Sequence, residues 1–252
     1  MTYNTTGIIL KYRDIGEFDR IYSILTSDHG KVEAWAQGVR KPQSKLVAHL
    51  QPLYLCDFMF ARGRRFDRVA QVKILERFPV LWADLEKLSK AVYAAALVDL
   101  VLRPGTRERA VFELFLSTLK LLEKGDGALE LMFALKLVRE TGFSPELRNC
   151  VLCKKEVDGL TRYFDAIRGG VLCNDCFVRF SPEAFPISSL TLETLESILN
   201  APLARLELPQ VVRQEFGHIV KMMIEMHFGE RPKSQAFIDF FAREPLAIPA
   251  GV

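Results

Sequence analysis

Two cysteine pairs constrain this chain more than any other feature of its sequence. Cys150 and Cys153 form one C-x2-C pair, Cys173 and Cys176 form a second, and a glycine-containing stretch of 19 residues separates them. A C-x2-C turn lets two thiolates converge on one ion, so two such turns at this separation complete a tetrahedral zinc site. We therefore expect one structural Zn²⁺ in a zinc ribbon over residues 149–177.

Other uses of paired cysteines are disfavoured. Disulfides require an oxidising compartment, and a redox C-x-x-C needs only one pair within a βαβ pattern that this sequence lacks. Four cysteines leave no open coordination position, so the metal should stabilise a fold and not activate water. The fifth cysteine, Cys56, lies in an apolar run and is expected to be an ordinary buried residue.

The compartment is predicted from two further features. Residues 1–6 show no basic segment followed by an apolar one, so no secretory signal is predicted. The longest stretch without Asp, Glu, Lys or Arg is the 11 residues 46–56, well short of the roughly 20 apolar residues of a membrane span. We expect a cytoplasmic chain with reduced cysteines and no membrane partner.

The first eighty residues show the alternating pattern of β-strands. Apolar runs and alternations of strand length occur at 8–12, 21–25, 32–36, 53–60 and 66–74. A long polar interruption at 38–45 separates the third from the fourth. Five short strands fit a small closed barrel better than an open sheet, because closure removes exposed edges. We therefore predict an OB-fold domain over residues 1–80.

After Phe78 the apolar period changes to that of helices. Helical patterns occupy about 81–100, 107–123, 128–141, 190–199 and 211–227, with a shorter apolar one around 237–241. The predicted class is thus an α+β multidomain protein, in which an N-terminal β-barrel precedes an all-α domain with an inserted zinc ribbon. The two parts of that helical domain are predicted at 81–148 and 178–252.

Positive charge is concentrated near the N-terminus. The formal net charge of the chain is only +3, but residues 1–80 carry +5 and residues 36–73 alone carry +6. Such a cluster suggests a polyanion partner. The candidate DNA-binding residues are Arg13, Lys31, Arg40, Lys41, Lys45, Arg62, Arg64, Arg65 and Arg68.

Aromatic residues lie among these cations. Base stacking on single-stranded nucleic acid needs exposed rings next to basic groups. Tyr12, Trp35, Tyr54, Phe60 and Phe66 are the candidates, and each of them could instead belong to the barrel core. The sequence leaves these two roles open.

Several of these features occur together with longer sequence motifs. They include Gly7-Ile-Ile-Leu-Lys-Tyr-Arg-Asp-Ile-Gly-Glu-Phe-Asp-Arg20, Gly38-Val-Arg-Lys-Pro-Gln-Ser-Lys45, Leu75-Glu-Arg-Phe-Pro79 and the four cysteines after Gly142-Phe-Ser-Pro-Glu-Leu147. Over residues 7 to about 185, the sequence resembles the RecO family of bacterial DNA repair and recombination mediators.

The resemblance implies a fold and a function. It implies an OB domain, a helical domain interrupted by a zinc ribbon, binding to single- and double-stranded DNA, and strand annealing without nucleotide hydrolysis. It also implies a nucleoid-associated protein whose partners are RecR, the C-terminal tail of the single-stranded-DNA-binding protein (SSB) and, indirectly, the RecA recombinase. The expected protein is not an enzyme.

Two alternatives remain. An RNA- or ribosome-associated protein with an OB-fold and a zinc ribbon could use the same basic surface. A zinc hydrolase or nucleobase deaminase has less support, because deaminases need an H-x-E and a P-C-x-x-C motif, whereas no histidine here is followed by x-E and Asn149 precedes Cys150. No phosphate-binding, dinucleotide or H-E-x-x-H motif occurs either.

Overall fold

The computed structural model describes residues 1–105, 108–125, 127–157, 162–180 and 183–229. They form two compact units, one comprising Met1–Phe112 and the other beginning at Glu113. The helical pattern expected around 237–241 lies outside the described residues. None of the described helices has the length and apolar character needed to cross a membrane.

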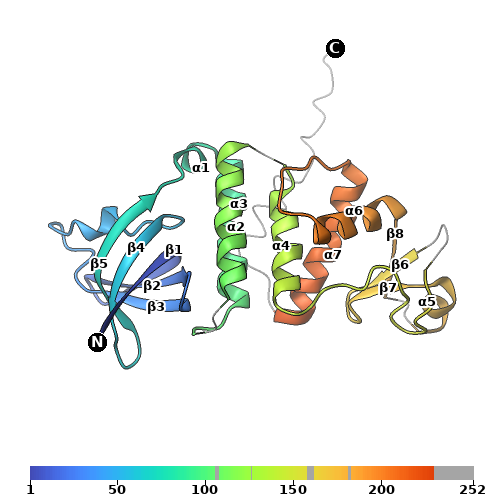
Figure 1. The fold of residues 1–252 in the computed structure, drawn as a ribbon, viewed down its shortest axis with the longest axis horizontal. Coiled ribbons are helices and arrows are strands. Elements are labelled where there is room, and N and C mark those ends of the chain that lie inside the picture. The colour runs from blue at the N-terminus through green and yellow to red at the C-terminus, as the bar shows by residue number, and fades with distance from the viewer. Residues whose placement is uncertain (106–107, 126, 158–161, 181–182, 230–252) are drawn as a thin grey trace, which may run out of the picture. The chain divides into compact units, whose positions relative to one another are not determined.

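The first unit contains the predicted barrel. Five strands close it in the order β1-β2-β3-β5-β4 (Figure 1). They are β1 (Thr2–Ile15), β2 (Asp19–Thr26), β3 (Gly30–Ala36), β4 (Leu55–Ala61) and β5 (Asp67–Glu76). All pairings are antiparallel except that of β3 with β5, which is parallel and comprises only Ala34 with Asp67 and Trp35 with Arg68.

Apolar side chains from all five strands fill the barrel, including the fully buried Ile9, Ile24 and Cys56. Cys56 is thus the ordinary core residue that the sequence predicts. Gly7 of β1 packs tightly against β2, since a Cβ there would lie 2.8 Å from Cγ2 of Ile24. Strand β1 pairs with β4 through its first half and with β2 through its second, with an irregularity of register between Ile9 and Lys11. This shift in register lets one long strand pair with both β2 and β4.

The helical segment after the barrel differs from its prediction. The sequence predicts one helix over 81–100, but the structure has α1 (Pro79–Ala83) and α2 (Leu85–Val101). Asp84 between them is extended, and its carboxylate accepts hydrogen bonds from the backbone N–H groups of Glu86 and Lys87. The break occurs because this side chain satisfies two amides that would otherwise lack partners at the start of α2.

Helix α2 is held against the barrel by Asp99. Its carboxylate accepts from Oγ of Ser23 at 2.6 Å and from Nζ of Lys11 at 2.5 Å. Nζ of Lys31 lies 3.4 Å from the same carboxylate and donates to the backbone oxygen of Asp99 at 2.5 Å. Three residues of β1, β2 and β3 therefore converge on one acidic side chain of α2.

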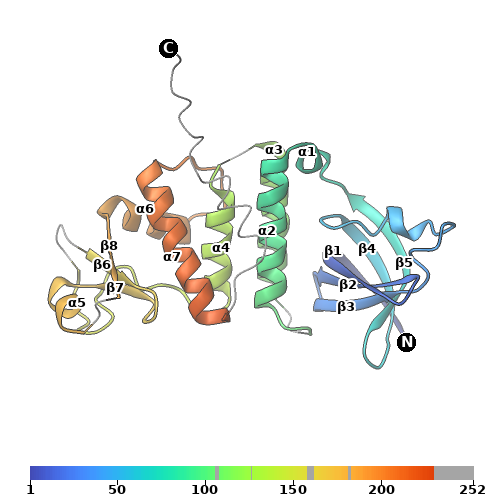
Figure 2. The ribbon, with the colours of Figure 1, turned by 180° about the vertical axis from the view of Figure 1, so that it is seen from behind.

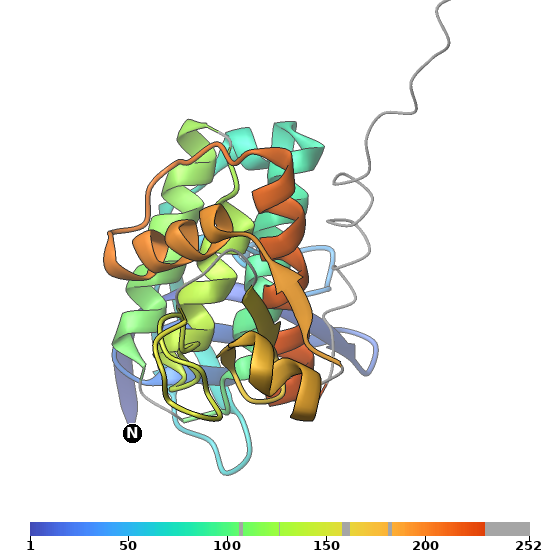
Figure 3. The ribbon, with the colours of Figure 1, turned by 90° about the vertical axis from the view of Figure 1, so that its right-hand side faces the viewer.

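The second unit combines helices with a small sheet (Figure 2, Figure 3). Helix α3 (Arg109–Lys124) leads into it, and α4 (Leu129–Glu140), α6 (Ser189–Asn200) and α7 (Gln210–Phe228) pack against one another. The core between these three helices includes the buried Phe133, Leu195 and Phe216. The N-cap Ser188 and Glu215 join α6 to α7, since Oγ of Ser188 donates to the Glu215 carboxylate at 2.7 Å.

The insertion between α4 and α6 contains the segment predicted as a zinc ribbon, and its architecture is compatible with one. Strands β6 (Arg162–Asp165), β7 (Gly170–Leu172) and β8 (Phe185–Ile187) form a sheet in the order β7-β6-β8, and α5 (Asn174–Phe180) follows β7. The rings of Tyr163 and Phe177 stack with their centroids 3.6 Å apart and join α5 to the sheet. Strand β8 lies beyond residue 177, where the sequence predicts the ribbon to end.

Candidate metal centre and nucleic-acid interface

The four predicted ligands converge. The Sγ atoms of Cys150, Cys153, Cys173 and Cys176 all lie within 4.8 Å of one another, and none is in a disulfide. Sγ of Cys153 lies 3.7 Å from Sγ of Cys173. Zinc–sulfur bonds of about 2.3 Å in a tetrahedron give sulfur–sulfur edges of about 3.8 Å. The cysteine cluster therefore has the dimensions of a four-thiolate metal site.

Backbone turns bring these sulfurs together. The amide of Lys154 donates to the carbonyl of Cys150 at 2.9 Å, and Lys154 has a positive φ of 64°, which closes the first turn tightly. The amide of Val151 donates to the carbonyl of Val171, so the first turn is joined to β7 just before Cys173. Cys176 lies in the first turn of α5, the helix that follows β7.

The cluster is electrostatically suited to a cation. Burial raises the pKa of the Cys150 thiol, but backbone amides, chiefly those of Cys153 and Cys173, donate to it and lower that pKa to about 6. At Cys176, burial and the neighbouring cysteines raise the pKa to about 12. Four thiolates this close repel one another, and a divalent cation removes that repulsion. The residues present thus fit a bound metal ion, which would link the first turn to β7 and α5.

Most of the predicted cations are exposed on the barrel. Arg40, Lys41 and Lys45 lie on the loop after β3, Arg62, Arg64 and Arg65 lie on the turn between β4 and β5, and Arg13 and Arg68 lie on β1 and β5. We call these eight residues the basic face. Its parts meet through shared contacts: Arg13 and Arg65 lie over the same Phe66 ring, at 5.7 and 5.1 Å from its centroid. Lys41 and Arg68 line one recess.

Lys31 is the exception among the predicted DNA-binding residues. Its side chain is only 9% exposed, and its ammonium group is bound to Asp99. Because the charge is already paired and covered by protein, Lys31 is not available to a phosphate. We therefore leave it out of the basic face.

The aromatic side chains divide between the two roles that the sequence leaves open. Phe60 is fully buried in the barrel core. Trp35 and Phe66 are half-buried with arginines over their rings. Tyr54 is half-buried beside Arg77, and Tyr12 is 40% exposed beside Arg20.

The structure adds two aromatic rings next to cations that the sequence did not reveal. Tyr3 lies under Arg62, 4.9 Å from ring centroid to Cζ, and Phe18 lies 5.7 Å from Nζ of Lys41.

Comparisons with known proteins agree with this architecture. Residues 1–78 match the family model described as Recombination protein O N terminal, and residues 83–236 match Recombination protein O C terminal. The chain is 35% identical over 247 residues to the DNA repair protein RecO of Pelotomaculum thermopropionicum, covering 96% of each chain. It is 34% identical to that of Desulforudis audaxviator, covering 94% of this chain and 96% of the relative.

A third relative, the DNA repair protein RecO of Rubrobacter xylanophilus, is 34% identical over 228 residues, which are 89% of this chain and 92% of the relative. The names of all three relatives state a role in DNA repair. Because both family models and these full-length relatives match, the chain belongs to the RecO family of DNA repair proteins.

Proposed function

We propose that this chain is a DNA-binding recombination mediator. It binds single- and double-stranded DNA through the basic face, anneals complementary strands without hydrolysing a nucleotide, and acts with RecR and the SSB tail to help load RecA. It works in the cytoplasm at the nucleoid. One observation carries this proposal: the basic face places exposed cations and aromatic rings side by side on a RecO-family barrel.

The charges of this face are largely uncompensated. Arg40 lies 3.4 Å from Asp14, but Arg62, Arg64, Arg65, Lys41 and Lys45 have no ion pair with a carboxylate of any described residue. Guanidinium and ammonium groups in this state bind phosphate oxygens and release counterions. Contacts of this kind position a nucleic acid without reading its sequence. We therefore expect binding that is independent of sequence and sensitive to salt.

Annealing follows from the same chemistry. Two phosphate backbones repel each other, and a basic surface that holds both lowers this repulsion. Lysine and arginine side chains bound to phosphates leave the base edges free to pair. No nucleotide hydrolysis is needed for this step.

We assign the cysteine cluster to one structural Zn²⁺, held by Cys150, Cys153, Cys173 and Cys176. A four-thiolate shell supplies structural stability and leaves no position for a substrate. The ion would fix the fold of the ribbon and take no part in DNA chemistry.

A fluorescence annealing assay tests the proposal. At micromolar protein and low salt, wild-type chain should accelerate annealing of complementary oligonucleotides, naked or coated with SSB, in the absence of ATP. Charge reversal at Arg62, Arg64 and Arg65 should depress both rates. The matched control reverses three exposed cations of the second unit, Lys124, Lys155 and Arg179, and should leave annealing of naked strands unchanged.

Two results would count against this function. A wild-type annealing rate no greater than the spontaneous one would indicate a protein that binds DNA without promoting annealing. A clear preference for RNA over single-stranded DNA of the same sequence, measured at one salt concentration, would favour an RNA- or ribosome-associated protein. The salt concentration must be fixed because these affinities depend on it steeply.

A further inference from the structure

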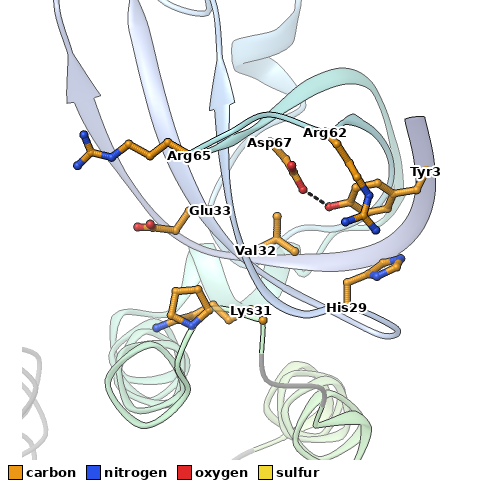
Figure 4. Close-up of a pocket in the computed structure, with 10 residues that line it drawn as sticks. Tyr3, His29, Lys31, Val32, Glu33, Arg62, Arg65 and Asp67 are labelled. Carbon is orange, nitrogen blue, oxygen red and sulfur yellow. Dashed lines mark hydrogen bonds between the residues drawn. The ribbon is translucent and has the colours of Figure 1, made fainter. Parts of the chain in front are cut away.

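A cavity of about 310 Å³ opens on the barrel beside the short β3–β5 pairing (Figure 4). Tyr3 and Arg62 lie at one end of it, with His29 below them, and Arg65 and Glu33 lie at the other end (Figure 4). The lining residues come from β1, β3 and β5, from the turns between β2 and β3 and between β4 and β5, and from the segment after α2. The cavity belongs entirely to the first unit.

The aromatic end of the cavity is held in place by its own contacts. The Tyr3 hydroxyl donates to Oδ2 of Asp67, while Oδ1 of Asp67 accepts from the amide of Gly63 at 3.1 Å. His29 meets the Tyr3 ring edge-on with centroids 4.5 Å apart, and Cζ of Arg62 lies 4.9 Å from the Tyr3 centroid. Asp67 therefore serves to orient the Tyr3 ring and the turn. These contacts form a preorganised wall.

The remaining polar groups of the cavity are available to a ligand. The guanidinium groups of Arg62 and Arg65 and the carboxylate of Glu33 make no ion pair with any described residue. Lys31 also borders the cavity, but Asp99 binds its ammonium group. The site thus offers two cations for an anionic group, one acceptor for an N–H donor, and aromatic rings at the end that holds Arg62.

We propose that this cavity is a subsite for one unpaired nucleotide of the single strand that the barrel binds. The phosphate contacts Arg62 and Arg65, and the base lies against the Tyr3 and His29 wall with an N–H directed at Glu33. This inference rests on the proposed DNA binding and adds a ligand class and three residues, Tyr3, His29 and Glu33, to it.

The chemistry favours a nucleotide over a simple anion. Glu33 and Asp67 would repel a free phosphate, whereas a nucleobase presents N–H donors to such a carboxylate and a flat face to the rings. The cavity volume is at the lower end of the range for small-ligand sites, which suits one base and its sugar. A base inside a duplex is paired and stacked and cannot enter without the cost of unpairing.

A second recess could receive the next part of the same single strand. Lys41, Gln37 and Arg68 line it on the other side of the β3–β5 pairing. Glu33 of the first site lies in β3, and Gln37 of the second directly follows the end of β3 at Ala36. Four residues separate them, which corresponds to about 13 Å for an extended chain. A single strand running across the pairing would meet cations in both recesses.

Photo-cross-linking tests the subsite directly. An oligo-dT strand carrying one 5-iodo-deoxyuridine should cross-link to Tyr3 or His29, identified by mass spectrometry of the digested complex. The same label placed inside a duplex should not. His29→Ala should abolish the His29 cross-link and weaken single-strand binding about tenfold, at the lower end of what one base stack contributes. Duplex affinity should stay within twofold.

The control is His218→Ala, because His218 makes the same edge-on ring contact, with Phe185 at 4.3 Å, in the second unit. It should leave both affinities unchanged. If wild-type protein binds the strand but cross-links only elsewhere, or if His29→Ala weakens duplex and single strand equally, the subsite is wrong and the proposed DNA binding stands. If wild-type protein binds no DNA at low salt, the proposed function itself fails.

Discussion

The Asp99 carboxylate has partners of very different exposure. The Lys31 side chain is 9% exposed and that of Lys11 is 65% exposed, although both ammonium groups reach the same acidic residue. A buried charge that loses its partner is costly, whereas an exposed ion pair contributes little. Comparing the two lysines therefore measures how much burial adds to the contribution of an ion pair to stability.

We expect Asp99→Asn to lower the free energy of unfolding of the first unit by about 3 kcal/mol, because it leaves the Lys31 charge buried without a counter-ion. Lys31→Met removes that charge and keeps the apolar part of the side chain. It should lower the free energy of unfolding less than Asp99→Asn does. Lys11→Met should change stability by less than about 1 kcal/mol. Urea unfolding of the three variants measures this, and equal losses for Lys11 and Lys31 would contradict it.

The same residue predicts a pH dependence. Burial alone would raise the pKa of Asp99, but hydrogen bonds from Lys11 and Ser23 and the Lys31 charge outweigh burial, and the pKa lies below its ordinary value of 3.8. A lowered carboxyl pKa stabilises the fold above the ordinary value and loses that contribution as pH falls below it. The stability difference between wild type and Asp99→Asn should therefore be constant near neutrality and shrink below about pH 4. A difference that grows on acidification would contradict this assignment.

At the scale of elements, the predicted zinc ribbon has little regular secondary structure. Its three strands are 4, 3 and 3 residues long, and the first cysteine turn is joined to them by a few backbone hydrogen bonds. Structural zinc supplies on the order of 10 kcal/mol in small peptides, comparable with the whole margin of a domain, about 5 to 15 kcal/mol. The ribbon should therefore depend on its metal.

Elemental analysis should find one zinc per chain, and Cys150→Ser should release it. Residues 149–177 should then lose protection from hydrogen exchange and protease, while the barrel keeps its protection. Cys56→Ser is the control, since Cys56 is buried in the barrel far along the chain from the cluster, and it should retain the zinc. Full protection of the ribbon after metal removal would show that the site is not structural.

Whether a segment forms a strand or a helix was largely predictable here. The repeat of apolar residues changes from two residues, as in strands, to 3.6 residues, as in helices, after Phe78. The break at Asp84 was missed because apolar residues keep helical spacing across it, although Asp followed by helix formers is an N-cap signal. Strand β8 was missed because three residues are too few to show alternation. The C-x2-C pairs revealed the cysteine cluster because both spacings are local.

The site residues set by long-range contacts were not predictable. Lys31 looks like its basic neighbours in the sequence, and only its contact with Asp99, 68 residues away, removes it from the basic face. Tyr3 and His29 carry no motif, and they meet because β1 and the turn between β2 and β3 lie side by side in the closed barrel. Spacing reveals local ligand sets, whereas a recess formed by separate strands requires the fold.

At the scale of the whole molecule, the uneven charge distribution makes salt dependence the most direct test of where DNA binds. If about five cations of the basic face contact phosphates, log K against log salt should have a slope near −3.5 for a single strand. Replacing Arg40, Lys41 and Lys45 with Ala should flatten that slope by about 2. Ala at Lys124, Lys155 and Arg179 should leave the slope as it is, and the reverse result would place DNA on the second unit.

The parallel pairing of β3 with β5 also bears on how the barrel forms. The hairpins β1–β2, β2–β3 and β4–β5 join neighbours in the chain, whereas two pairings are distant in sequence: β1 with β4, through seven residue pairs, and β3 with β5, through only two. Contacts distant in sequence carry a larger loop-closure cost and tend to form late. Because only two residue pairs offset this cost at β3–β5, closure there should be the last step of barrel folding, and its amides should be the first to open in the native state.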